Sequence, residues 1–123
     1  MALPALWNAK YEEYLGLTPP TDSEGILQDI HWSEALFGYF PTYALGSAYA
    51  AQFYAYMNRD FDVDAALRSK DFHKIKNWLN EKIHKHGTKY TTDEIMLREF
   101  GEALNVKYFA EYLNKKYSEI YAL

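Results

Sequence analysis

The sequence contains no cysteine. The chain therefore forms no disulfide and no thiolate metal site, and this composition is typical of a reducing cytoplasm rather than of secretion. No stretch approaches a membrane span or the apolar region of a signal peptide, because even residues 43–57 are short and interrupted by polar side chains. We expect a cytoplasmic protein with no membrane partner.

A basic excess is also missing. The formal net charge is -4, and acidic and basic residues are interspersed along the 123 residues. A nucleic acid or an anionic membrane surface attracts a basic stripe, which this sequence does not offer. We therefore expect no nucleic-acid partner.

Aromatic side chains are abundant. They make up 18% of the sequence, with twelve tyrosines, and hydrophobic residues reach 49%. This composition excludes disorder and indicates a ring-rich interior or interface. The length is near the commonest domain size, so we predict one domain over residues 1–123.

The first half of the sequence predicts three helical segments. Apolar residues lie on one face before Gly16, and two consecutive prolines then interrupt the chain. Ser23 is a candidate cap for a short segment in which Ile26, Leu27 and Ile30 form the buried stripe. A longer helix is expected from near Thr42 to near Asn58, and its many small residues predict neighbours packed closely on all sides.

The second half predicts further helices. Asp62 caps a short one, Asp71 precedes one that closes at Gly87, and Thr91 with Glu94 forms a capping box for a helix ending at Gly101. A last helix begins near Asn105. No stretch alternates with the period of a strand, so the expected fold is all-α, with about six or seven helices.

One stretch carries chemistry that helix building does not need. Residues 25–32 and 37–43 hold a glutamine, an aspartate, a histidine, a tryptophan and two tyrosines. The side chains that stand out are Gln28, Asp29, His31, Trp32, Tyr39 and Tyr43. A histidine and a tyrosine are suitable donors to an oxyanion, and an aspartate is the usual partner that orients an imidazole.

The pattern Gly-x-x-Gln-Asp-x-His-Trp at residues 25–32 resembles a signature of the thermostable, or Taq-type, zinc metallocarboxypeptidases. The similarity continues through residues 37–46, 50–52, 83–87 and 108–117 in the same order. It implies the C-terminal region of a larger, mostly helical hydrolase that removes residues from peptide C-termini with zinc or another divalent metal. One departure is Glu34-Ala35-Leu36, where the family commonly has small residues, often glycines.

A second departure concerns the metal. The family binds zinc through a His-Glu-x-x-His helix and a downstream glutamate, whereas the four histidines here are His31, His73, His84 and His86. None of them is paired four residues apart with an intervening glutamate. His84 and His86 are explained by the dipole at a helix C-terminus. We predict that this chain binds no metal and is inactive alone, the ligands and general base coming from a missing N-terminal catalytic part.

The resemblance implies that His31 with Tyr39 or Tyr43 stabilises the oxyanion, while Gln28, Asp29 and Trp32 bind substrate or orient His31. Simpler alternatives remain. The alternative for His31, which the signature makes the weaker one, is an interior histidine bonded to Asp29 or Gln28, and either tyrosine is as well explained by packing.

The expected partners are a peptide substrate, the missing catalytic part and a second copy of the chain. Homo-oligomerisation is expected because the family is usually homodimeric, and because separation from the catalytic part exposes apolar surface. The alternative function is a stand-alone helical interaction module derived from the same family. The residues encoded upstream of the chain would discriminate the two.

Overall fold

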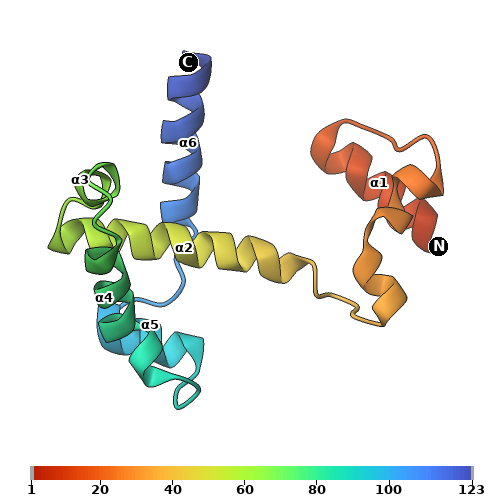
Figure 1. Ribbon diagram of the computed structural model, residues 1–123. Coiled ribbons are helices and arrows are strands. Elements are labelled where there is room, and N and C mark those ends of the chain that lie inside the picture. The colour runs from red at the N-terminus through yellow and green to blue at the C-terminus, as the bar shows by residue number, and fades with distance from the viewer. Residues whose placement is uncertain (1, 123) are drawn as a thin grey trace. The chain divides into compact units, whose positions relative to one another are not determined.

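The computed structural model describes residues 2–122, and all regular structure in that range is helical (Figure 1). The expectation of an all-α fold is confirmed. No helix in this range is both long and apolar enough to cross a membrane. The α-helices are α1 (Leu3–Leu15), α2 (Pro41–Asp60), α3 (Val63–Arg68), α4 (Phe72–Lys82), α5 (Thr92–Phe100) and α6 (Lys107–Tyr121). Four short 3-10 helices are η1 (Asp22–Glu24), η2 (Ile26–Gln28), η3 (Ile30–Glu34) and η4 (His84–His86).

The chain divides into two compact units, the first ending at Thr42 and the second beginning at Tyr43. Each unit is described by itself. The first contains α1 and the 3-10 helices η1 to η3, and the second contains nearly all of α2 and every later helix. A single domain over the whole chain stays a prediction.

In the first unit, α1 leads into a proline-containing loop that folds closely over Gly25. The helix ends at Gly16, whose left-handed backbone (φ 66°) is the conformation that glycine adopts most easily. A Cβ atom at Gly25 would lie 3.0 Å from the Cβ of Pro19, so this close approach favours glycine. Ile26 follows directly and is only 5% exposed, which makes it the apolar centre of this loop.

The helical segment predicted after Ser23 differs from the observed structure in two respects. Ser23 does not cap it: η2 begins after Gly25 without a side-chain cap, and Thr21 caps the preceding η1, where its hydroxyl oxygen accepts the backbone N–H of Glu24 at 3.3 Å. The segment is also split into η2 and η3 by Asp29, whose backbone is extended (φ -78°, ψ 98°). The predicted buried stripe is therefore wrong for Leu27 and Ile30, which are 64% and 75% exposed.

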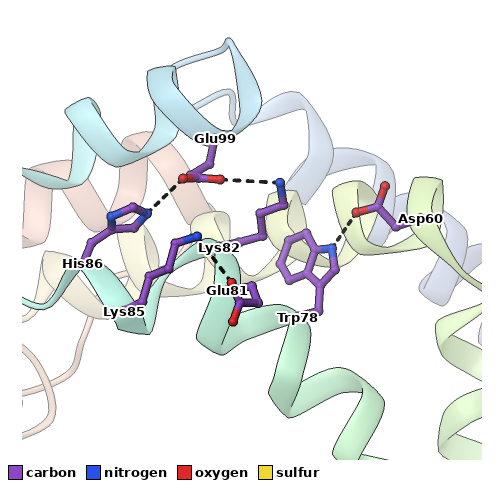
Figure 2. Close-up of polar contacts among 7 residues, drawn as sticks. All are labelled: Asp60, Trp78, Glu81, Lys82, Lys85, His86 and Glu99. Atoms are coloured by element: carbon purple, nitrogen blue, oxygen red, sulfur yellow. Dashed lines mark hydrogen bonds and ion pairs between the residues drawn. The ribbon is translucent and has the colours of Figure 1, made fainter.

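The second unit is built on an aromatic core. Tyr56, Met57, Val63 and Trp78 are buried together. Phe100 from α5 stacks on both large rings, with centroids 4.6 Å from Tyr56 and 5.7 Å from Trp78. Figure 2 shows that the Trp78 indole also donates to Asp60 at 2.6 Å. The core therefore ties α2 to α4 and α5.

The predicted helix starts of the second unit are confirmed. The side chain of Asp62 accepts the N–H of Ala65 at 2.8 Å and caps α3, and Asp71 caps α4 in the same way. Thr91 and Glu94 form the capping box of α5. Each cap satisfies backbone donors that the first helical turn leaves without partners.

Helix α2 is not covered on all sides, contrary to the prediction from its small residues. Its buried residues are Ala48, Gln52, Tyr56 and Met57, whereas residues 41–47 are all exposed within this chain. Figure 1 shows α4 and α5 against one side of α2 and α6 leaving it on another. The uncovered sides of α2 carry small and apolar residues rather than charged ones, since its first charged residue is Arg59.

Candidate functional site

The side chains of Asp29 and His31 form the centre of the candidate site. Asp29 lies at the N-terminus of η3, and its Oδ1 accepts the backbone N–H of His31 at 2.9 Å. The same oxygen lies 2.7 Å from Nδ1 of the His31 ring, and both side chains are largely buried, at 13% and 15% exposed. A carboxylate only accepts hydrogen bonds, so this contact places a proton on Nδ1.

The ring of His31 is also packed between aromatic side chains. The ring centroid of Tyr39 lies 5.1 Å away and that of Phe40 lies 5.6 Å away. Asp29 thus fixes one edge of the imidazole while the two rings restrict its rotation. The sequence did not identify Phe40 as a site residue. Its position directly before Pro41, which begins α2, was the only sequence feature that pointed to it.

Two backbone turns bring Tyr39 back to His31. Ala35 has a left-handed backbone (φ 57°), and the carbonyl of His31 accepts the N–H of Leu36 at 2.9 Å. Gly38 (φ 77°) then allows the N–H of Tyr39 to bond the Leu36 carbonyl at 3.3 Å. Glycine adopts the Ala35 conformation more easily than alanine, so this turn carries a backbone cost at Ala35.

Gln28 and Trp32 make contacts that are structural in kind. The exposed side chain of Gln28 donates to the backbone carbonyl of Ser23, which closes the loop before η2. The half-buried ring of Trp32 lies 6.3 Å from Trp7 in an edge-on arrangement and 6.1 Å from Phe37. Their assignment to substrate binding stays a prediction.

Tyr43 lies in the first turn of α2 and is 57% exposed, and Tyr39 is 44% exposed. The structure therefore brings Asp29, His31 and Tyr39 together within the first unit. Tyr43 belongs to the second unit, so its convergence on His31 stays a prediction. Both tyrosines retain an accessible surface, as a donor to a substrate needs.

The described part of the chain offers no cluster of side chains that fits a divalent metal. Within residues 2–122 no three histidine, aspartate or glutamate side chains are placed to hold one ion. His84 Nδ1 lies 2.8 Å from Asn80 Oδ1, and His86 Nε2 lies 2.9 Å from Glu99 Oε1 (Figure 2). These two histidines are engaged in separate contacts rather than sharing a ligand position.

The sequence of the chain, including the part around His31, is similar to the sequences of known metallopeptidases. Residues 1–117 match the family model described as Carboxypeptidase Taq (M32) metallopeptidase. Carboxypeptidase 1 of Bacillus subtilis is 53% identical over 122 residues, which are 98% of this chain and 24% of that protein. The chain thus spans about a quarter of the length of this relative.

Solved structures agree with this similarity. A carboxypeptidase from Pyrococcus furiosus is 41% identical and superimposes with a TM-score of 0.87 over 94% of this chain and 23% of that one. An M32 carboxypeptidase from Deinococcus radiodurans is 37% identical, with a TM-score of 0.87 over 98% of this chain and 25% of that one. The match covers nearly all of the sequence, including the segment that holds Asp29 and His31. The chain belongs to the carboxypeptidase Taq (M32) metallopeptidase family.

Proposed function

We propose that the chain is the C-terminal region of a metal-dependent carboxypeptidase that hydrolyses C-terminal residues from peptides. In this proposal it supplies one wall of the substrate cleft and the side chains that stabilise the oxyanion. The observation that carries the proposal is the Asp29–His31 pair, at 2.7 Å, inside the family signature. The name of the Bacillus subtilis relative, Carboxypeptidase 1, supports the reaction class.

The geometry of the pair defines how His31 would act. With Nδ1 donating to Asp29, the ring presents Nε2 to a substrate. Nε2 donates a hydrogen bond only when the imidazole is positively charged, and the carboxylate of Asp29 balances that charge. Asp29 is then a positioning residue, and His31 is the donor to the oxygen that becomes negative during peptide hydrolysis.

A tyrosine hydroxyl would be the second donor. Tyr39 is supported by its ring contact with His31, and Tyr43 by its place in the matching pattern. Removing one oxyanion donor from a hydrolase typically lowers kcat by about 10² to 10³. The comparison of Tyr39→Phe with Tyr43→Phe would identify the tyrosine that acts.

The metal and the general base are assigned to a part of the enzyme outside this chain. The sequence offers no His-Glu-x-x-His, and the described residues provide no ligand cluster. We therefore expect the purified 123-residue chain to bind no stoichiometric zinc and to release no amino acid from peptides. Metal analysis and a peptide hydrolysis assay test this, and either stoichiometric zinc or turnover would overturn it.

The decisive experiment changes His31 in the full-length enzyme that carries this segment. His31→Ala should lower kcat by about 10² to 10³ with little change in the unfolding midpoint. The matched control is His73→Ala, because His73 is an exposed histidine on α4. Unchanged turnover in His31→Ala would contradict the donor role, and loss of folding without a specific loss of turnover would show a structural role.

The positioning role of Asp29 has its own readout. In the wild-type chain, nitrogen NMR should find Nδ1 of His31 protonated. Asp29→Ala should shift the ring toward the tautomer protonated on Nε2, since alanine removes the oxygen that accepts from Nδ1, whereas asparagine would keep one. An unchanged tautomer in the variant would remove Asp29 from the proposal while leaving His31 in it.

A further inference from the structure

A groove lies on the side of α2 that faces α5 and is here called the α2–α5 groove. Its volume is about 810 Å³. Its apolar lining residues are Gly46, Ala50, Phe53, Ile83, Ile95 and Met96, and Thr88, Thr91 and Thr92 are among its polar ones. Only Lys89 and Glu94 among its lining residues are charged. A surface of this kind suits the apolar face of a helix.

Helix α2 contributes no charged side chain to this groove. No charged residue precedes Arg59 in the helix, yet residues 41–47 are exposed in this chain. An exposed helix surface without charged side chains is commonly covered by a neighbouring element. At Gly46 an added Cβ would meet no atom within 4 Å, so the surface above it is open.

A second groove lies on another side of the same helix. It has a volume of about 480 Å³ and is lined by Ser47, Ala50 and Ala51 of α2 and by residues of α6. Ala50 lines both grooves. The helix thus has small residues on two sides, which lets neighbouring helices approach closely.

We propose that the α2–α5 groove is the docking site of an amphipathic helix from the rest of the M32 enzyme. This rests on the proposed function. The relatives have about four times the length of this chain, so ample sequence exists outside it to supply that helix. One helical turn with its side chains, about 10 to 12 Å wide and 5.4 Å long, fills on the order of 500 Å³. The groove therefore accommodates between one and two turns.

The test compares one substitution series in two settings. The first is the 123-residue chain, and the second is a chimera in which this chain replaces the matched 122 residues of the Bacillus subtilis relative. The series is Gly46→Ala, Gly46→Leu and Gly46→Trp. In the short chain the open space at Gly46 leaves room, and alanine or leucine should raise the unfolding midpoint by roughly 2 to 6 °C.

In the chimera the docked helix would occupy that space. The larger residues should then lower the unfolding midpoint by roughly 2 to 10 °C, with tryptophan worse than leucine. The control is Ser118→Leu, because Ser118 is exposed on α6 and lines neither groove. It should change the midpoint by about 1 °C or less in both settings.

A parallel trend in both settings would overturn the proposal, because it would show that the groove stays open in the enzyme. Light scattering tests the alternative occupant. If the chimera is a dimer and Gly46→Leu makes it a monomer, the groove binds a second copy of the chain rather than a helix of the same enzyme, and the proposal is contradicted. A second measurement needs no chimera. The 123-residue chain is mixed with a Bacillus subtilis relative that lacks the matched segment. A 1:1 complex that is lost when the chain carries Gly46→Leu supports the proposal. A 1:1 complex that still forms with Gly46→Leu contradicts it.

Peptide hydrolysis is not the readout of this test, so the two proposals fail separately. A chimera that hydrolyses peptides equally well with His31→Ala would contradict the oxyanion role without affecting the groove. A Gly46 series that stabilises both proteins would contradict the groove without affecting His31.

Discussion

The hydroxyl of Tyr56 donates a 2.6 Å hydrogen bond to Oε2 of Glu102, which links α2 to the segment between α5 and α6. Glu102 also accepts from Asn105 at 2.6 Å and from the Tyr108 hydroxyl at 3.0 Å. The bonds from Tyr56, Asn105 and Tyr108 hold the pKa of Glu102 below its usual range. This carboxylate therefore gathers the polar contacts that anchor the start of α6 to α2.

The first prediction is that Tyr56→Phe destabilises the chain. Hydrogen bonds to charged groups contribute about 1.5 to 3 kcal/mol, and the ring stays buried against Phe100. We expect the free energy of unfolding to fall by about 1 to 3 kcal/mol in urea denaturation. The control is Tyr54→Phe, whose ring is 39% exposed and whose hydroxyl bonds Asp64, and it should cost about 0.5 kcal/mol or less. Equal losses in both variants would contradict a special role for the Glu102 contact.

The second prediction concerns alkaline pH. Burial, together with the bonds to Glu102 and Tyr108, raises the pKa of Tyr56 to about 12. A tyrosine in an unfolded chain has a pKa of about 10, so the folded state keeps the proton longer. This stabilisation is complete below about pH 10 and is lost as the pH rises toward about 12. Stability measured across this range should fall less steeply in Tyr56→Phe than in the wild type, and identical slopes would contradict the prediction.

The third prediction is that Gln52→Ala is among the most damaging changes in the second unit. Gln52 is fully buried at 0% exposed, and its amide donates to the carbonyl of Ala103 at 3.0 Å. Its oxygen accepts the backbone N–H of Asn105 at 2.9 Å. Alanine would leave both backbone groups without partners at a cost of about 1 to 3 kcal/mol each, in addition to a cavity.

We therefore expect Gln52→Ala to lower the free energy of unfolding by about 2 to 5 kcal/mol in denaturant titrations. Gln28→Ala removes the same side chain from an exposed position and should cost about 0.5 kcal/mol. A loss below about 1 kcal/mol in Gln52→Ala would show that the loop before α6 is held by other contacts.

The helix starts were predictable from sequence because their causes are local. Asp62, Asp71 and Thr91 each cap a helix through a backbone group three residues along the chain. The side chain of Asp29 acts just as locally, since it accepts the N–H of His31 and so caps η3 in the middle of the predicted segment. Side chains of this type compete with helical backbone bonds, and this competition ended the segment that the apolar pattern predicted to continue.

The parts that sequence did not predict depend on contacts between distant residues. Gln52 reads as one polar residue of a long helix, and its partners Ala103 and Asn105 lie 51 and 53 positions away. The ring contact of His31 with Tyr39 depends on a left-handed backbone at Ala35, a residue type that rarely adopts it. The roles of the site residues came from a resemblance, and their chemistry stays a prediction.

The fourth prediction concerns Glu99, which joins α5 to the end of α4. Its carboxylate lies 2.9 Å from Nε2 of His86 and 3.4 Å from Nζ of Lys82 (Figure 2). Burial acts to raise the pKa of Glu99, but the bonds from His86 and Lys82 outweigh it and hold the pKa below its usual value. The folded chain therefore stabilises the charged carboxylate.

A carboxylate of this kind contributes stability above the pKa of a glutamate in the unfolded chain, about 4.3, and loses it as the pH falls through the lower folded pKa. Glu99→Gln should lower the free energy of unfolding by about 1 to 2 kcal/mol near neutral pH and flatten its decline below about pH 4 to 5. Glu81→Gln is the control, because Glu81 pairs with Lys85 at 3.4 Å but is 75% exposed, and it should change little. Stability curves of wild type and Glu99→Gln that stay parallel through the acid range would show that Glu99 carries none of the acid sensitivity.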